Sequence, residues 1–156
     1  MVRCEPGAGA LIGDDEDLAT RHARSDGYEA MLNTGGFDEA LTRAVLYVLA
    51  ADRVIDQRCA LALNVARQRL MHLSLAQFKV LVRDQSFVLQ LEPDLAVSAL
   101  ASIVPEADAR EDLLKQVNAI IGAGGSPDAA GRDRLALLSS LLHVSRAKRL
   151  AVVASR

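Results

Sequence analysis

The chain has 156 residues, of which 51% are hydrophobic and only 3% aromatic, and it contains no tryptophan. This length suits a single domain with its own core. A core of this composition must be built from leucine, valine, alanine and isoleucine, as in packed helices. A net charge of −2 argues against a general nucleic-acid-binding protein, which needs a basic face.

Residues 1–26 are expected to form a poorly ordered tail, because they are rich in glycine and acidic residues and show no hydrophobic periodicity. They lack the basic-then-apolar layout of a signal peptide, and no window of the chain reaches the ~18 apolar residues of a membrane helix. Cys4 and Cys59 do not suggest a disulfide framework. We therefore expect a cytoplasmic protein with free thiols and no integral membrane segment.

The first half of the domain predicts a short helical segment at 28–33 and two longer helices. Apolar residues recur at helical spacing over 37–52. A connector at 53–55 follows, and Asp56 is expected to cap a helix over 57–71. The residues expected to be buried in the two long helices are Phe37, Leu41, Val45, Val48, Leu49, Leu61, Val65 and Leu70.

The second half begins with a capping box. Ser74 precedes Gln77 by three residues, which predicts a helix that starts there and reaches about Leu91. Pro93 fits the first turn of a helix that ends at Pro105, and another helix is expected over 106–122. The residues expected to be buried in these helices are Leu75, Phe78, Leu81, Val82, Val88, Leu95, Ala99, Leu100, Val104, Leu113, Leu114, Val117, Ile120 and Ile121.

The last long helix follows a glycine-rich break, with Ser126 as the expected cap and Pro127 at its first position. It is expected to end at about Val144, before a short basic helix or tail over 145–156. Its expected buried residues are Leu135, Leu138 and Leu142. The fold prediction is all-α: a compact bundle of six to seven helices over 27–144.

Two stretches carry a recognisable pattern. One runs from Gly35-Gly36-Phe37 to Asp52-Arg53-Val54-Ile55-Asp56, and the other comprises Leu73-Ser74-Leu75-Ala76-Gln77-Phe78-Lys79, Val82-Arg83-Asp84-Gln85 and Leu89-Gln90-Leu91-Glu92. With them, residues 28–144 resemble the TerB-like helical module, named for tellurite resistance, at the C-terminal end of polyhydroxyalkanoate synthase-like proteins of unknown function. The resemblance implies an all-helical domain of two related halves. Each half would carry an Asp-Gly turn followed by a helix with a carboxylate.

Such acidic turns suggest a divalent-cation site, because hard cations need several oxygen ligands gathered at one point. The sequence departs from the family pattern at both turns. Arg53 and Cys59 replace the expected glycine and helix carboxylate of the first turn, and Gly124-Gly125 replaces the Asp-Gly pair of the second. The candidate metal ligands that remain are Asp52, Asp56 and Asp128. The fixed positive charge of Arg53 opposes a divalent ion beside them, so we expect a weak site.

Candidate catalytic groups are few. The hydrolase-type domain of the family is absent, and no nucleophile elbow is present. Cys59 and His72 stand thirteen residues apart, about 20 Å along one helix, so Cys59 is interpreted as a small buried side chain. His72 and His143 are expected near helix C-termini, where a cation is favourable, and His22 lies in the tail. The glycine run at 122–125 lacks the strand and Lys-Ser/Thr of a phosphate loop.

The C-terminal segment combines basic and apolar residues: Arg146, Lys148, Arg149, Leu150, Val152, Val153 and Arg156. We interpret it as a final helix that packs its apolar side, and docking to an anionic surface or a partner is the alternative.

The sequence therefore predicts a non-catalytic interaction or accessory module with an unidentified protein partner and no cofactor. The rival hypothesis is a divalent-metal-binding stress-response protein, and a third is a hydrolase with an unrecognised site. Self-association, and origin as a detached part of a larger fused protein, are left open.

Overall fold

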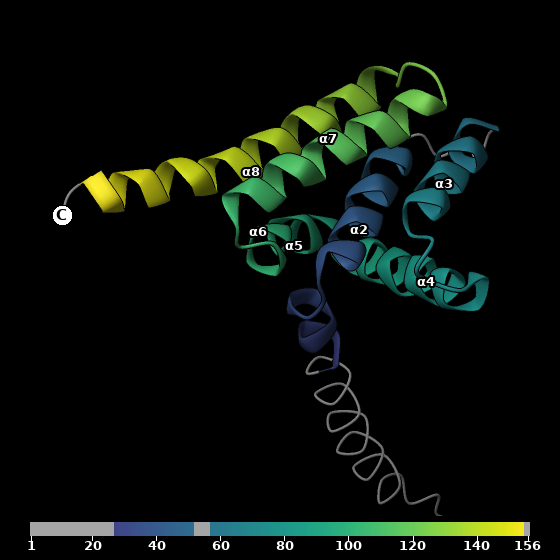
Figure 1. Ribbon diagram of the computed structural model, residues 1–156, viewed down its shortest axis with the longest axis horizontal. Coiled ribbons are helices and arrows are strands. Elements are labelled where there is room, and N and C mark those ends of the chain that lie inside the picture. The colour runs from purple at the N-terminus through teal and green to yellow at the C-terminus, as the bar shows by residue number, and fades with distance from the viewer. Residues whose placement is uncertain (1–26, 52–56, 155–156) are drawn as a thin grey trace, which may run out of the picture. The chain divides into compact units, whose positions relative to one another are not determined.

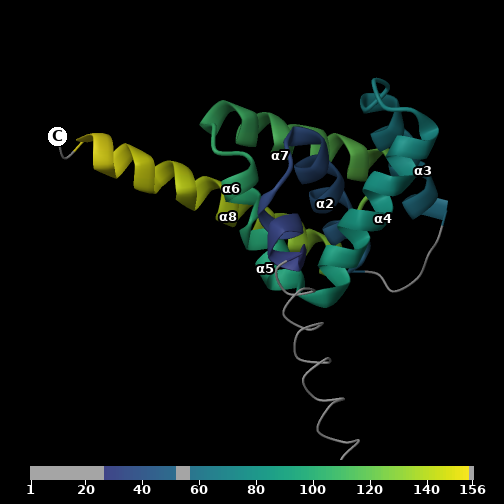
Figure 2. The same cartoon turned by 90° about the horizontal axis from the view of Figure 1, so that it is seen from below.

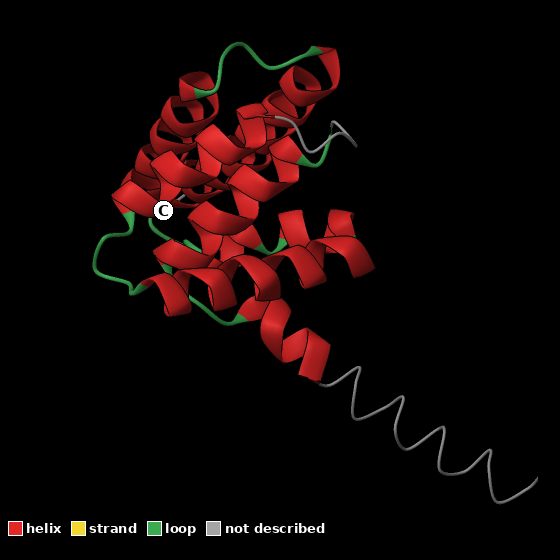
Figure 3. Ribbon diagram, turned by 90° about the vertical axis from the view of Figure 1, so that its right-hand side faces the viewer, coloured by secondary structure: helices red, strands yellow, loops and turns green. Residues whose placement is uncertain are grey.

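The computed structural model describes residues 27–51 and 57–154, with side chains placed through His143. Within these residues the chain consists of helices joined by loops and contains no strand (Figure 3), which confirms the all-α prediction. Residues 27–33 are helical, and seven helices follow (Figure 1): α2 (Phe37–Leu49), α3 (Gln57–Arg69), α4 (Leu75–Leu91), α5 (Pro93–Ser98), α6 (Leu100–Ile103), α7 (Ala107–Ala123) and α8 (Ala129–Ala154).

None of these helices is long and apolar enough to cross a membrane. The chain divides into two compact units, residues 1–31 and 32–156, and the second holds all seven helices.

Helix α2 is the centre of the second unit. It packs against α4, α5, α6, α7 and α8 and lies between α4 and α7 (Figures 1 and 2). Its side chains are buried on nearly every side from Ala40 to Val48, with Leu46 half-buried. The helix begins after Gly35, whose φ of +131° is a conformation that favours glycine, and the backbone N–H of Gly36 donates to Glu39 Oε2 at 2.7 Å.

The capping box predicted for α4 is confirmed. The backbone N–H of Gln77 donates to Ser74 Oγ at 3.2 Å, and the backbone N–H of Ser74 donates to Gln77 Oε1 at 2.8 Å. The two reciprocal bonds satisfy N–H groups that a helix start otherwise leaves without partners. The buried stripe predicted for α7 is also confirmed, because Leu113, Leu114, Val117, Ile120 and Ile121 are all buried.

The buried face of α3 differs from the prediction. Ala62 and Ala66 are the buried residues of the helix, whereas Leu61 is 52% exposed and Val65 is half-buried. Helix α3 packs against α7, and small side chains at successive turns allow two helix backbones to approach closely. Only Leu70, just past the helix end, is buried as predicted.

The segment after Pro93 forms two short helices rather than one. Helix α5 ends at Ser98 and α6 starts at Leu100, with Ala99 as the junction. Ala96 and Val97 are buried and Leu95 is 54% exposed, so the predicted burial of Leu95 is wrong. In α4, likewise, Leu75 is 45% exposed because it lies at the first position of the helix.

The last helix begins and ends at later residues than predicted. Helix α8 starts at Ala129, and its cap is Asp128 rather than Ser126, since the backbone N–H of Gly131 donates to Asp128 Oδ1 at 2.8 Å. The helix continues past Val144 to Ala154. Residues 145–154 contain neither glycine nor proline, so nothing in the backbone stops the helix there.

Arg43, on α2, is a buried cation within the core. It is 0% exposed, and its Nε donates to Gln85 Oε1 on α4 at 2.8 Å. Its Nη1 donates to the carbonyl oxygens of Leu32 at 2.9 Å and Ala96 at 3.1 Å. One side chain therefore joins α2, α4, α5 and the segment that precedes α2.

Two further arginines bind carbonyl groups at helix ends. Arg110 donates to the carbonyls of Val104 and Ala101, both at 2.6 Å, at the end of α6. Arg134 donates to the carbonyl of Tyr47 at 2.6 Å, and its guanidinium carbon lies 4.7 Å from the centre of the Tyr47 ring. Positive charge at a helix C-terminus is favourable because the last carbonyls carry partial negative charge, and the stacked ring adds a cation–π contact.

Candidate functional site

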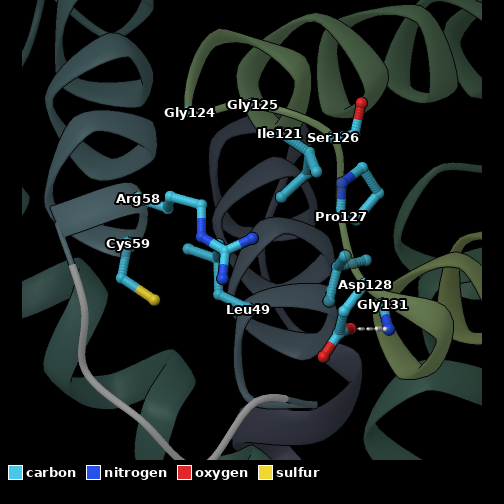
Figure 4. A pocket seen from close by; sticks show the side chains of 11 residues that line it. Leu49, Arg58, Cys59, Ile121, Gly124, Gly125, Ser126, Pro127, Asp128 and Gly131 are labelled. Atoms are coloured by element: carbon cyan, nitrogen blue, oxygen red, sulfur yellow. Dashed lines mark hydrogen bonds between the residues drawn. The ribbon is translucent and has the colours of Figure 1, made fainter.

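The start of α3 and the turn between α7 and α8 lie against each other. A Cβ atom at Gly124 would meet the backbone oxygen of Arg58 at 2.8 Å, so a side chain at this position would push the two elements apart. A cavity of about 30 Å³ lies between them, lined among others by Arg58, Cys59 and Asp128 (Figure 4). This volume holds about one water molecule. The structure thus brings together the neighbourhoods of the two turns that the resemblance suggested as a metal site.

Of the three candidate metal ligands, only Asp128 lies in the described part of the chain. Asp128 lines the cavity, and one of its carboxylate oxygens caps α8. Asp52 and Asp56 lie outside the described residues, so their placement as ligands stays a prediction. Among residues 27–51 and 57–154, no three histidine, cysteine or acidic side chains are grouped to hold a metal. Arg58 lines the same cavity as Asp128 (Figure 4), and its fixed charge opposes a cation there.

Cys4 and His22 lie outside the described residues, and Cys59, His72 and His143 form no common site. Cys59 is partly exposed and lines the small cavity, which differs from the predicted buried side chain. His72 Nε2 contacts Asp38 Oδ2 at the start of α2, a long-range contact that the sequence did not indicate. His143 lies well inside α8 because that helix runs to Ala154, so the helix-end explanation for His143 is wrong.

Helix α4 has an exposed apolar face opposite its buried one. Val80 is 46% exposed, Phe87 50% and Leu91 51%, and Leu95 at the start of α5 is 54% exposed. We call these four residues the α4 outer stripe. The three on α4 are spaced at i, i+7 and i+11, which places them on one side of a helix. Phe78, Gln85, Val88 and Leu89 are buried on the other side.

A groove lies between the first turn of α2 and α4. It has a volume of about 430 Å³, far larger than the cavity beside Asp128. Its apolar wall is formed by Leu73, Ala76, Val80 and Leu81, and Glu39 and Asp84 add carboxylates. We call this feature the α2–α4 groove. It shares Val80 with the α4 outer stripe, so the two surfaces adjoin on one side of α4, where the helical spacing places Asp84 between Val80 and Phe87.

The sequence missed both surfaces for the same reason. Helical periodicity finds one buried face, and α4 carries enough apolar residues to supply an exposed face as well. The sequence did contain a signal, because α4 has more apolar residues than one buried face needs. Val80, Phe87 and Leu91 fall between the residues predicted to be buried. A search for a second apolar stripe on each predicted helix would have found them.

Comparison with known proteins gives one informative relative. The chain is 30% identical, over 121 residues, to a protein of Rhizobium meliloti described as an uncharacterised protein in the ackA 5′ region. The match covers 75% of this chain but only 16% of that relative's length. No known family profile and no solved structure matches the chain. The chain therefore spans only a small part of the length of that relative.

Proposed function

We propose that the chain is a non-catalytic helical interaction module of the cytoplasm, similar to the TerB-like modules that its sequence resembles. The α4 outer stripe carries this proposal. Single exposed apolar residues are common on protein surfaces, but a row of them along one helix is the pattern that another helix or an apolar partner surface covers. The role would be to bind a larger protein and to hold it through this face.

The geometry of the stripe supports a helix-sized contact. On α4 it spans 12 residues from Val80 to Leu91, about 16 Å for the 11 steps of 1.5 Å between them. Phe87 lies between its two ends and is the largest side chain in it. Aromatic side chains near the centre of an interface commonly contribute most of the binding free energy. We expect Phe87 to be the residue on which binding depends most.

The relative supports an accessory role. A segment similar to this chain makes up 16% of a longer protein, so in that protein it is joined to other sequence. A segment of this kind can serve the rest of the protein by contact instead of by its own chemistry. The resemblance to the C-terminal modules of polyhydroxyalkanoate synthase-like proteins agrees with the same arrangement.

Affinity purification from the native host tests the proposal with a matched control. The test variant is Phe87→Asp/Leu91→Asp, and the control is Leu61→Asp on α3, an equally exposed leucine (52%) away from α4. All chains are first checked for helical content by circular dichroism. A partner bound through the stripe is captured by the wild type and by the control and is lost with the test variant.

The purified partner is then titrated by calorimetry. We expect the test variant to weaken binding by at least about 30-fold, since central interface residues commonly contribute 2 kcal/mol or more. A partner that binds the wild type and the test variant equally would refute the role of the stripe. A partner that is chemically converted by the purified chain would refute the non-catalytic proposal.

A further inference from the structure

The α2–α4 groove combines an apolar wall with negative charge. Among the described residues that line it, the charged ones are Glu39 and Asp84, and none is basic. Its two glutamines are engaged within the fold: Gln77 belongs to the capping box, and Gln85 accepts from the buried Arg43. An occupant that matches this groove is apolar on one side and positively charged beside it.

The C-terminal end of α8 has the matching composition. Residues 145–156 contain four basic residues and no acidic residue, together with Leu150, Val152 and Val153. We call this segment the α8 tail. Its chemistry is the complement of the groove: cationic where the groove is anionic, with aliphatic residues to meet an aliphatic wall.

The α8 tail extends beyond the helix that supports the rest of α8. Helix α8 has 26 residues and α7 has 17, so at 1.5 Å per residue α8 is longer by about 13 Å. Figure 1 shows the last turns of α8 continuing past the start of α7. A helix end that projects in this way is positioned to contact another molecule.

The tail cannot occupy the groove of its own chain. The C-terminal end of α8 and helix α4 lie at opposite ends of the second unit in both views (Figures 1 and 2), and α8 is a continuous helix that would have to break to return. The occupant that fits is therefore the tail of a second copy. We propose that the chain self-associates by placing the α8 tail of one copy in the α2–α4 groove of another, an inference that stands independently of the proposed function.

The contact is expected to be weak and dependent on salt. A helix end of a few turns buries much less than the ~800 Å² per partner of a standard stable interface. Charge attraction contributes to it and is screened as ionic strength rises. Self-association should therefore be measured from about 5 to 500 µM, in low and high salt.

Two full-length variants test the proposal by sedimentation equilibrium. The first reverses the tail charge with Arg146→Glu, Lys148→Glu and Arg149→Glu. The second reverses the groove with Ala76→Arg and Asp84→Lys, at an exposed and a partly exposed position. Asp84 loses with this change its surface pair with Arg83 at 3.3 Å. The control is Asp112→Lys on α7, which makes outside the groove the same +2 charge change that Asp84→Lys makes inside it.

We expect the wild type and the control to self-associate and each variant alone to dissociate at least about tenfold more readily. An equimolar mixture of the two variants should associate again as a one-to-one complex. In that mixture, the unmodified groove of the first variant meets the unmodified tail of the second, and the reversed tail of the first meets the reversed groove of the second. No surface other than the tail and the groove predicts this rescue.

Three results would overturn the proposal: a wild type that is monomeric at 500 µM, a tail variant that associates as the wild type does, or variants that do not associate when mixed. Binding of the wild type, but not the tail variant, to anionic phospholipid vesicles with no self-association would assign the tail to a membrane surface instead. Phe87 and Leu91 are unchanged in every chain used here. Failure of this proposal therefore leaves the partner test on the α4 outer stripe unaffected.

Discussion

Replacing the buried Arg43 should cost a large part of the stability of the fold. In Arg43→Met, a side chain of similar length loses the guanidinium. Three acceptors then lose their donor: Gln85 Oε1 and the carbonyl oxygens of Leu32 and Ala96. Each buried acceptor left without a partner costs about 1–3 kcal/mol. Removal of a buried positive charge offsets part of this loss, so we expect a net decrease of about 3–5 kcal/mol in the free energy of unfolding.

Urea unfolding followed by circular dichroism measures this change, and calorimetry gives the melting temperature. For a chain of this length, 1 kcal/mol shifts the melting temperature by about 2–4 °C, so the expected decrease is about 6–20 °C. The double variant Arg43→Met/Gln85→Met should lose less than the sum of the two single variants, because the residues contact each other.

Arg83→Met is the matched control, since the Arg83 side chain is 74% exposed and pairs only weakly with Asp84 at 3.3 Å. It should change stability by less than about 0.5 kcal/mol. A decrease of under about 1 kcal/mol for Arg43→Met, or one equal to that of Arg83→Met, would refute the reasoning. The guanidinium would then not be what joins α2, α4 and α5.

Gly124→Ala should destabilise the fold by about 1–3 kcal/mol, because the added Cβ would lie 2.8 Å from the backbone oxygen of Arg58. The control Gly122→Ala should be neutral or stabilising, because its Cβ would meet nothing within 4 Å. Equal urea midpoints for the two variants would contradict the close approach of Gly124 to Arg58. Burial raises the pKa of the Tyr47 hydroxyl above its usual 10.0, and the charge of Arg134 opposes this increase. The stabilisation associated with the neutral hydroxyl is therefore present below pH 10 and is lost as the pH rises above 10. In melts at different pH values, Tyr47→Phe should show a smaller fall in stability above pH 10 than the wild type. A metal site with a micromolar dissociation constant would raise the free energy of unfolding by about 4 kcal/mol in 1 mM Ca²⁺, Mg²⁺ or Mn²⁺. With Arg58 beside Asp128, we expect a smaller shift of the melting temperature. A shift of about 8 °C or more would favour the metal-binding alternative.

Local features of the chain were predictable because their causes lie within a few residues. The capping box at Ser74 and Gln77 depends on two side chains three positions apart, and it starts α4 where predicted. Pro93 and the glycines after α7 likewise end or begin helices through their own backbone preferences. The buried stripe of α7 followed from periodicity, because that helix has one apolar face and one polar face.

Helices with an ambiguous pattern were assigned the wrong face. In α3 the sequence predicted that the larger residues Leu61 and Val65 were buried, but Ala62 and Ala66 are. The choice depends on how closely α7 approaches, and Gly124 makes that approach close. No property of α3 alone contains this information.

The sequence by itself determined that the chain is helical and where most helices begin. Only the tertiary structure decided which apolar residues remain exposed, since the α4 outer stripe and the buried residues of α4 are chemically alike. Only the tertiary structure placed Arg43 in the core, where it donates to the side chain of Gln85 and to the backbone carbonyls of Leu32 and Ala96. The physical reason is the same in both cases: burial depends on which helices pack together, and packing is a property of residues far apart in the chain.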